Sequence, residues 1–378
     1  MGSSLEPIWD SVASAERARF RHVIVDEDNP EHPHCKAAGD LDGGGRADLV
    51  AASAGIGGLF WYRAPDWTKH PVAHGVYTTD MALGDVDGDG ALDIIIPSDD
   101  GLMWYRNPRG AGQDPTGPWE AVNISPAGAR MHNVEVADLN GDGTLDIVTR
   151  HQSGFGHWLG NQLHLWVQET PTRFHHRSLS CPHGEGLAVA DVDGDGRPDV
   201  IIGGRWYRNP GDVLGGEWTE HRYMPEERFA TGWTNGDVMV RVGDVNGDGR
   251  MEIVLSPSEG QGHLSWFAPS DDPCEPDWQE HVIAVTDHTH ALALGDMDGD
   301  GRLGIVTAKM HQASAPQSVA VYYNRGPAGW ARQELATTGS HNIALGDVEG
   351  EGRQSVFGAN WNNVARTHGR LELWVNVG

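Results

Sequence analysis

Seven acidic, glycine-rich segments recur along the chain, and their carboxylates are the first candidates for chemistry. The complete copy DVDGDGALD, which begins at Asp85, has Asp at positions one, three, five and nine and Gly at positions four and six. Ca²⁺ takes about six to eight oxygen ligands, so several carboxylates directed to one point suit it. Glycine permits the tight turn that such a loop needs. The copies begin at Asp40, Asp85, Asp138, Asp191, Asp244, Asp296 and Asp347.

We expect Ca²⁺ in the four copies that keep an oxygen ligand at all four positions. The other copies are altered: that from Asp40 lacks the fifth-position acid, that from Asp296 has Gly304 at position nine, and that from Asp347 is degenerate. A feature repeated in every unit serves the unit, so we expect the ions to be structural. The predicted ligands are Asp85, Asp87, Asp89, Asp93; Asp138, Asn140, Asp142, Asp146; Asp191, Asp193, Asp195, Asp199; and Asp244, Asn246, Asp248, Glu252.

A second group of candidates precedes these segments. Strand periodicity would place residues six and eight positions before each first Asp on one face. The first set is His34, Thr79, His132, Glu185, Val238, His290 and His341. The second is His32, Tyr77, Arg130, His183, Gly236, His288 and Gly339. Titratable groups that converge in this way favour a binding or catalytic site.

The repeat itself indicates which elements position these residues. Successive first Asp residues are 45, 53, 53, 53, 52 and 51 residues apart. Each interval contains a strand, the acidic loop, a second strand, a third strand ending in an aromatic cluster such as MWYRNP, and a fourth strand. Short aromatic strands bounded by Gly, Pro and Asn predict four antiparallel strands per repeat. Seven repeats predict an all-β, seven-bladed propeller.

The two ends of the chain are expected to close the ring. After Asp347 only the second and third strands of a blade remain, whereas RFRHVIVD at residues 19–26 is a spare fourth strand. The N-terminal strand would therefore complete the last blade. Residues 1–18 are predicted to be an extension and residues 19–378 a single propeller domain.

In a propeller the first strand is innermost, so its early residues would line the mouth of the central channel. The end of the second strand would reach the same rim. His34, His290 and His341 come from neighbouring blades and suit a transition metal such as Zn²⁺. Metal-free acid/base or hydrogen-bonding roles are the alternative.

The candidates for catalysis are His132, His151, Arg130, His183, Glu185, Lys309 and His311. Those for the substrate rim are Tyr77, Arg150, Asn360 and Trp361, the aromatic ones stacking on a sugar and Arg150 holding a carboxylate.

Other histidines follow a different pattern. His70, His221 and His281 lie in a repeated W-x-x-H on the predicted fourth strand, and His22 and His176 lie in an R-F-x-H version of it. Repetition at this outer position predicts packing within the blade.

The pattern DxDGDGxxD between two strands, followed by W-[FY]-R-N-P, resembles the FG-GAP or VCBS-type calcium-binding propeller repeat over nearly the whole chain. Proteins with this repeat include integrin-type recognition propellers, lectins, polysaccharide lyases and sugar dehydratases. The chain also resembles propeller carbohydrate lyases and the propeller part of aldos-2-ulose (anhydrofructose) dehydratase. It has no cupin segment, so an isomerase step tied to cupin domains is not implied.

Composition excludes several classes of function. A net charge of −27 argues against nucleic acid and anionic membranes as partners. No apolar run is long enough to cross a bilayer, and the N-terminal residues have no signal-peptide core. As written the sequence predicts a cytoplasmic protein, and a secreted one if a leader has been removed. The three cysteines form no CxxC pair. A closed propeller needs no partner to complete its fold, which is consistent with a monomer.

The predicted mouth is rich in His, contains Arg and has Glu185 as its one acid at these positions. Motifs of serine hydrolases, nucleotide-binding proteins and HExxH zinc proteases are absent, as is the close carboxylate pair of most glycosidases. We therefore expect a carbon–oxygen lyase that removes a proton from a sugar or uronide, assisted by a metal or Arg, with His or Lys as base. One alternative is a carbohydrate-binding or protein-recognition propeller. Another is other metal- or His-dependent chemistry on a non-sugar metabolite. The mouth residues differ between blades, which favours one asymmetric site over repeated lectin sites.

Overall fold

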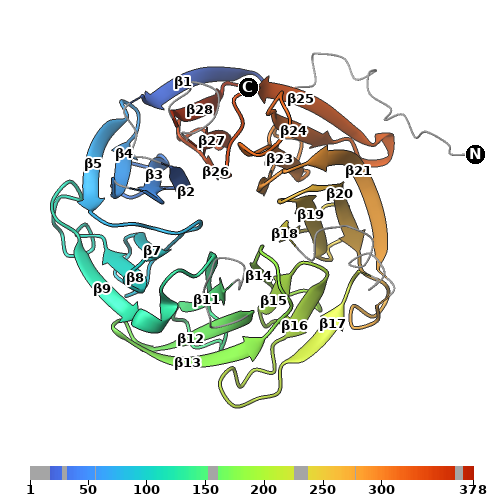
Figure 1. The fold of residues 1–378 in the computed structure, drawn as a ribbon, viewed down its shortest axis with the longest axis horizontal. Coiled ribbons are helices and arrows are strands. Elements are labelled where there is room, and N and C mark those ends of the chain that lie inside the picture. The colour runs from blue at the N-terminus through green and yellow to red at the C-terminus, as the bar shows by residue number, and fades with distance from the viewer. Residues whose placement is uncertain are drawn as a thin grey trace, which may run out of the picture.

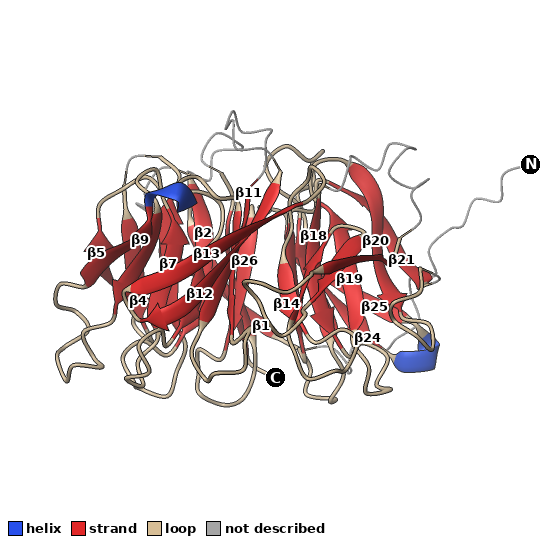
Figure 2. Cartoon of the chain, turned by 90° about the horizontal axis from the view of Figure 1, so that it is seen from below, coloured by secondary structure: helices blue, strands red, loops and turns tan. Residues whose placement is uncertain are grey.

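A computed structural model describes residues 18–27, 32–55, 57–151, 161–224, 237–276, 278–361 and 369–378. Over these residues the chain forms seven four-stranded antiparallel sheets arranged as a ring (Figure 1), with the first strand of each sheet nearest the centre. Seen from the side, the loops that connect the strands lie at the two faces of this ring (Figure 2). The predicted seven-bladed propeller is confirmed.

The two inner strands of each blade carry the acidic loop between them. The innermost strands are β2 (Pro33–Gly39), β6 (Ala82–Gly84), β10 (Asn133–Ala137), β14 (Ala188–Ala190), β18 (Val238–Gly243), β22 (Ala291–Gly295) and β26 (Asn342–Gly346). The second strands are β3 (Asp48–Ser53), β7 (Asp93–Pro97), β11 (Asp146–His151), β15 (Asp199–Ile202), β19 (Glu252–Pro257), β23 (Gly304–Ala308) and β27 (Ser355–Ala359). Each second strand therefore begins at the ninth residue of an acidic segment. These strands are buried along their whole length, which explains continuous apolar runs such as DIIIP.

The two outer strands complete each blade. The third strands are β4 (Leu59–Arg63), β8 (Leu102–Arg106), β12 (Gln162–Thr170), β16 (Arg205–Arg208), β20 (Gln261–Ala268), β24 (Val319–Asn324) and β28 (Leu371–Asn376). The fourth are β5 (Thr68–Ala73), β9 (Glu120–Ser125), β13 (Arg173–Ser180), β17 (Thr219–Arg222), β21 (Gln279–Asp287), β25 (Trp330–Ala336) and β1 (Phe20–Asp26). We number the blades one to seven from the one that begins with β2. The described helices are two short 3₁₀ turns, η2 (Pro126–Gly128) and η4 (Gly326–Ala328), and neither could span a membrane.

The N-terminal strand closes the ring as predicted. The seventh sheet has the order β1-β28-β27-β26, with Phe20 opposite Asn376. The backbone N–H of Val377 donates to the carbonyl of Arg19 at 2.8 Å. Both ends of the described chain are thereby held in one sheet, so the ring leaves no free edge at its closure.

An amide side chain links each of five blades to the blade before it. Asn107, in the RNP motif of blade two, donates from Nδ2 to the carbonyl of Leu41 in blade one at 2.9 Å and to that of Leu92 in its own blade at 3.0 Å. Asn107 is fully buried, so these bonds satisfy groups that water cannot reach. Equivalent contacts to the preceding blade are made by Gln168, Asn209, Asn324 and Asn376.

The outer histidines pack within the blades, as their repetition predicted. His221 on β17 stacks on Trp206 of β16, with ring centroids 4.5 Å apart. Trp206 is fully buried, and a buried Trp removes about 150–250 Å² of surface from water. The other described pairs are Trp61 with His70, Trp166 with His176, Trp266 with His281, and Trp374 with His22.

Candidate functional site

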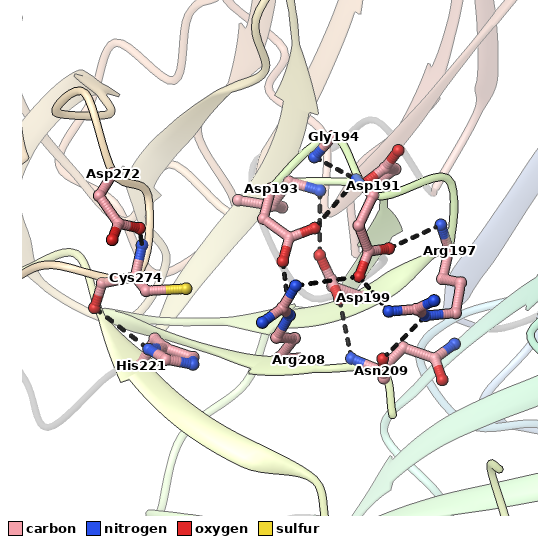
Figure 3. Close-up of polar contacts among 12 residues, drawn as sticks. Asp191, Asp193, Gly194, Arg197, Asp199, Arg208, Asn209, His221, Asp272 and Cys274 are labelled. Carbon is pink, nitrogen blue, oxygen red and sulfur yellow. Dashed lines mark hydrogen bonds and ion pairs between the residues drawn. The ribbon is translucent and has the colours of Figure 1, made fainter. Parts of the chain in front are cut away.

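In each acidic loop the first Asp accepts hydrogen bonds from the backbone of the loop. Asp191 accepts the N–H groups of Gly194 at 2.8 Å, Asp195 at 3.0 Å and Gly196 at 2.8 Å. Gly194 and Gly196 have φ values of 75° and 86°, which glycine adopts without strain. Figure 3 shows this loop. Hydrogen bonds within the motif itself therefore form the turn.

The ninth residue joins the loop to the third strand. Asp199 accepts from the N–H of Val192 at 3.0 Å and of Asn209 at 2.8 Å. Its side chain is fully buried, and burial raises the pKa of Asp199 to about 7, although these hydrogen bonds oppose the shift. The carboxylates of Asp191, Asp193 and Asp199 lie within 4.8 Å of one another, as a cation site requires. Comparable groups occur in the copies from Asp40, Asp85 and Asp296.

An arginine lies against the carboxylates of the same loop. Arg208 Nε is 2.6 Å from Asp193 Oδ2 (Figure 3). Its Nη2 is 3.2 Å from Asp195 Oδ2. The oxygen donors fit Ca²⁺, but an ion would share Asp193 with this guanidinium. The predicted calcium sites therefore stay a prediction.

A separate pocket lies at the channel mouth, on the face of the ring opposite the acidic loops. It has a volume of about 390 Å³. It receives most of the predicted mouth histidines and the predicted rim residue Trp361. Its described lining is His34, Thr79, His132, His183, Asp237, Glu259, His290, His311, Gln312, His341 and Trp361.

Five of the seven residues that lie six positions before a first Asp line this pocket. His132, His290 and His341 immediately precede the innermost strands of their blades, and His34 is the second residue of β2. The count of eight residues did not define the same face. His32, Arg130 and His288 have φ values of 56°, 58° and 45°, so the chain turns there and the strand alternation ends. Of the eight-residue set, His183 lines the pocket.

Three buried groups from different blades meet beneath the pocket. Glu185 Oε2 is 3.1 Å from His132 Nε2, and Glu185 Oε1 is 3.4 Å from His290 Nε2. Glu185 is fully buried, and His290 and His132 are 1% and 4% exposed. Burial raises the pKa of Glu185, but the charges of His290 and His132 outweigh it and lower that pKa to about 2. Burial lowers the pKa of His290, but Glu185 outweighs it and raises that pKa to about 9.

The predicted transition-metal residues His34, His290 and His341 form a stack of rings. The centroids of His34 and His341 are 3.8 Å apart, and those of His290 and His341 are 4.1 Å apart. Burial lowers the pKa of both His34 and His341 well below the ordinary value. Within the described part of the chain, the mouth residues with ligand atoms all within 4.8 Å of one another are instead His132, Glu185 and His290. A metal at the predicted trio stays a prediction.

Trp361 forms one wall of the pocket. Its ring centroid is 4.3 Å from that of His34 and 5.1 Å from that of His311. The side chain is partly exposed, so the indole can present a face to a ligand while the imidazoles support it.

Four predicted residues do not reach the pocket. Arg130 is exposed and pairs with Asp99 at 3.0 Å. Arg150 is 1% exposed and donates to the carbonyls of Glu185 and, at 2.8 Å, of Gly186. Arg150 therefore binds the backbone of blade four and does not face the pocket, where a substrate carboxylate would lie. His151 is 1% exposed and lies inside blade three, and Lys309 pairs with Asp287.

Two predicted rim residues are also interior. Tyr77 is 2% exposed, and its hydroxyl bonds to that of Tyr105 at 2.8 Å within the core between blades one and two. Asn360 is 5% exposed and donates to Gln317 Oε1 at 2.8 Å. The expected aromatic and polar rim is therefore reduced to Trp361.

The sequence analysis missed two carboxylates in the pocket. Glu259 lies fifteen residues after Asp244, at the same offset as His311 after Asp296, and this correspondence was a usable signal. Asp237 lies between the two counted positions of blade five, and its backbone forms an isolated parallel β-bridge with that of Glu185. Burial raises the pKa of Glu259 to about 7, helped by the charges of Glu185 and Asp237. The pocket is thus richer in acids than predicted, and its described lining includes no arginine.

Deeper in the channel is a second cavity of about 450 Å³. Its charged lining residues are Lys36, Asp80, Glu135 and Arg241. Met81, Val134, Leu292 and Ile343 also line it, two residues along the inner strands from the pocket positions. Charged and apolar side chains therefore both line the channel below the polar mouth.

Comparison with known families agrees with the architecture. The model of the FG-GAP-like repeat matches residues 40–96, 85–149, 191–255 and 244–307, which together exceed half of the chain. The chain belongs to the FG-GAP-like repeat family. Integrin alpha-PS2 of Drosophila melanogaster is 26% identical over 211 residues, which are 48% of this chain and 15% of that protein. This FG-GAP protein thus corresponds to a small part of the integrin.

Solved structures share the fold of this FG-GAP protein at low identity. A lectin of Agrocybe aegerita that recognises non-reducing terminal N-acetylglucosamine has a TM-score of 0.54 at 18% identity, over 85% of this chain and 81% of that one. BBS1N, solved in complex with ARL6DN, has a TM-score of 0.56 at 14% identity, over 95% of this chain and 97% of that one. Neither result bears on the resemblance to carbohydrate lyases or to the dehydratase, which stays a hypothesis.

Proposed function

We propose that this FG-GAP propeller binds a polyhydroxylated ligand, a sugar or uronide, in the channel-mouth pocket. The observation that carries the proposal is the lining: Trp361 supplies one flat apolar surface, and every other described lining residue carries a hydrogen-bonding group. A sugar presents C–H groups on its ring face and hydroxyls around its edge. An indole can stack on the first, while carboxylates and imidazoles bond the second.

The pocket is a single asymmetric site. Blade six contributes His290 and His311, whereas blade five contributes Asp237 and Glu259. The described lining residues therefore differ from blade to blade and do not form repeated equal sites. A lectin of the same fold recognises N-acetylglucosamine, so the fold is compatible with sugar binding.

Calorimetry and a glycan array test this proposal. We expect Trp361→Ala to weaken binding about tenfold or more, equivalent to about 1.4 kcal/mol. Trp67→Ala is the control, because Trp67 is also partly buried but precedes β5 at the acidic-loop face. Equal affinity of the two variants, or no glycan bound by the wild type, would contradict the proposal.

A second candidate function is the carbon–oxygen lyase, and Glu259 favours it. A carboxylate with a pKa of about 7 inside the pocket suits proton abstraction near neutral pH. In such a step Glu259 would take the proton next to a carboxylate, the C–H electrons would form a C=C bond, and the β-oxygen would leave with a proton from an imidazolium of the pocket lining. The Arg-assisted version loses support, because neither Arg130 nor Arg150 lines the pocket.

The lyase candidate is tested by the ultraviolet absorbance of the conjugated product formed from uronide oligosaccharides. We expect Glu259→Gln to lower the rate about 100-fold or more. Glu220→Gln, on the outer strand β17, is the control that removes the same charge. Absence of unsaturated product with the wild type would reject the lyase and leave the binding proposal standing.

A further inference from the structure

The cluster of His132, Glu185 and His290 has hydrogen bonds that fix which ring nitrogens carry protons. His290 Nδ1 is 2.9 Å from the backbone carbonyl of His341. A carbonyl can only accept, so Nδ1 donates to it and Nε2 of the neutral ring keeps its lone pair. That lone pair faces Glu185.

The same assignment holds for His132. Its Nδ1 is 3.1 Å from Asn133 Oδ1. This amide oxygen also accepts the N–H of Gly186 at 3.1 Å, which fixes the orientation of the Asn133 side chain. His132 Nδ1 is therefore a donor, and its Nε2 lone pair also faces Glu185.

Two lone pairs directed at a buried carboxylate repel it unless a proton or a metal cation lies among them. Glu185 lies close to the Ser258 hydroxyl as well as to the two rings, but neither of its oxygens makes a hydrogen bond of good geometry within the described part of the chain. A proton on His290 Nε2, which the raised pKa of that ring favours, relieves its contact with Glu185 but leaves the contact of His132 with Glu185 unrelieved. Protonating both rings would bury two positive charges beside one negative charge, which is costly. One divalent cation would interact favourably with all three groups.

The surroundings favour the cation. Asp237 and Glu259 add negative charge to the pocket, and its described lining contains no Lys or Arg. His132 Nε2 is 3.1 Å from Glu185 Oε2, and His290 Nε2 is 3.4 Å from Glu185 Oε1. Ligands around a tetrahedral ion with bonds of about 2.0–2.1 Å lie about 3.3 Å apart. Imidazoles that donate Nδ1–H to an oxygen and ligate through Nε2 are the usual arrangement at metal centres.

We propose that His132, Glu185 and His290 bind a divalent transition-metal ion of the zinc type through two imidazole nitrogens and a carboxylate. Two nitrogens and one oxygen suit this class better than Ca²⁺ or Mg²⁺. His132 and His290 also line the pocket, so the remaining coordination positions face it. The site differs from the trio predicted from sequence by two of its three residues, and it does not depend on the pocket binding a sugar.

The test uses the full chain, stripped with chelator and then supplied with excess Ca²⁺ to occupy the acidic loops. Co²⁺ is titrated in, and its visible absorption reports nitrogen ligation. We expect one Co²⁺ per chain in the wild type and at least about 100-fold weaker binding in His132→Asn and Glu185→Gln. His311→Asn is the control, because His311 lines the same pocket outside the cluster; it should keep full affinity.

A second measurement does not depend on variants that fold. X-ray absorption of the zinc-loaded wild type should show scattering from imidazole rings beside an oxygen ligand. A first shell of oxygen alone, no Co²⁺ absorption in calcium-loaded protein, or equal binding by folded His132→Asn and His311→Asn would overturn the proposal. Loss of sugar binding with the metal retained would affect only the proposed function.

Discussion

Arg208 Nε lies 2.6 Å from Asp193 Oδ2, so a side chain of the chain itself supplies a cation to the acidic loop. The loops with Asp at the third position repeat this pairing, in Arg63 with Asp42, Arg106 with Asp87 and Arg325 with Asp298. In the loops from Asp138 and Asp244 the third residue is Asn, and its amide donates to the fifth-position Asp at 2.9 and 3.0 Å. The loops therefore differ in how much positive charge a bound ion would meet.

We expect Arg208→Gln to strengthen calcium binding at the loop from Asp191. The repulsion between a guanidinium and a doubly charged ion about 4 Å away is about 2 kcal/mol in a water-like medium, or about thirtyfold in affinity. Calorimetry of chelator-treated protein measures the change. Arg173→Gln, which breaks the exposed pair with Glu169, removes the same net charge outside any loop and should leave the affinity unchanged. Weaker calcium binding in Arg208→Gln would show that the guanidinium supports the site.

The amide links between blades predict a large effect of Asn209→Ala. Asn209 is fully buried and donates to the carbonyls of Leu139 at 2.7 Å and Pro198 at 2.9 Å. Leaving these carbonyls without donors should lower the free energy of unfolding by about 1–3 kcal/mol, measured by urea titration. Asn123→Ala removes an exposed amide bond to Asp100 and should cost about 0.5 kcal/mol or less. Equal losses would contradict the role assigned to Asn209.

The fold could be predicted because one motif marks the same place in every blade. The acidic loop fixes the end of the first strand and the start of the second, so the residue six before the first Asp lines the mouth pocket in five of the seven blades. The N-terminal strand was recognisable because RFRHVIVD has the pattern of a fourth strand and the last repeat lacks one.

The rest of the site depends on contacts that strand counting does not contain. His132, Glu185 and His290 come from blades three, four and six, and their meeting depends on distances across the channel. Arg150 turns toward the carbonyls of blade four, and the positive φ of Arg130 ends the strand alternation. The direction of the Arg150 side chain and the backbone angle of Arg130 are set by local contacts, which the alternation of residue types along a strand does not predict.

Closure of the ring predicts that removing residues 1–26 prevents proper folding. This deletion removes β1, whose Val23 and Val25 pack against the core shared by blades one and seven, and it exposes the edge of β28. We expect aggregation or loss of cooperative thermal unfolding, seen by size-exclusion chromatography and calorimetry. Removing only residues 1–17 should leave the unfolding temperature unchanged. A soluble, cooperatively folding deletion of residues 1–26 would show that six complete blades suffice.

Lys36 predicts how stability changes with pH. The side chain is 5% exposed, and its ammonium donates to the carbonyls of Pro33 at 2.7 Å and His34 at 3.0 Å. Burial lowers the pKa of Lys36 from 10.5 to about 7. Between these values the unfolded chain holds the proton and the folded protein does not, so stability from this group rises with pH. Below pH about 7 both states hold the proton, and the burial of the charge destabilises the fold by a constant amount.

We therefore expect Lys36→Met to remove an upward slope of at most about 1.4 kcal/mol per pH unit between pH about 7 and 10. Lys69→Met is the control, because Lys69 pairs with Asp26 in a partly exposed position, and it should keep the slope. Urea unfolding at closely spaced pH values gives both curves. If Lys36→Met keeps the wild-type slope, Lys36 stays charged in the folded protein. The carbonyls of Pro33 and His34 would then stabilise a buried ammonium beside the channel mouth.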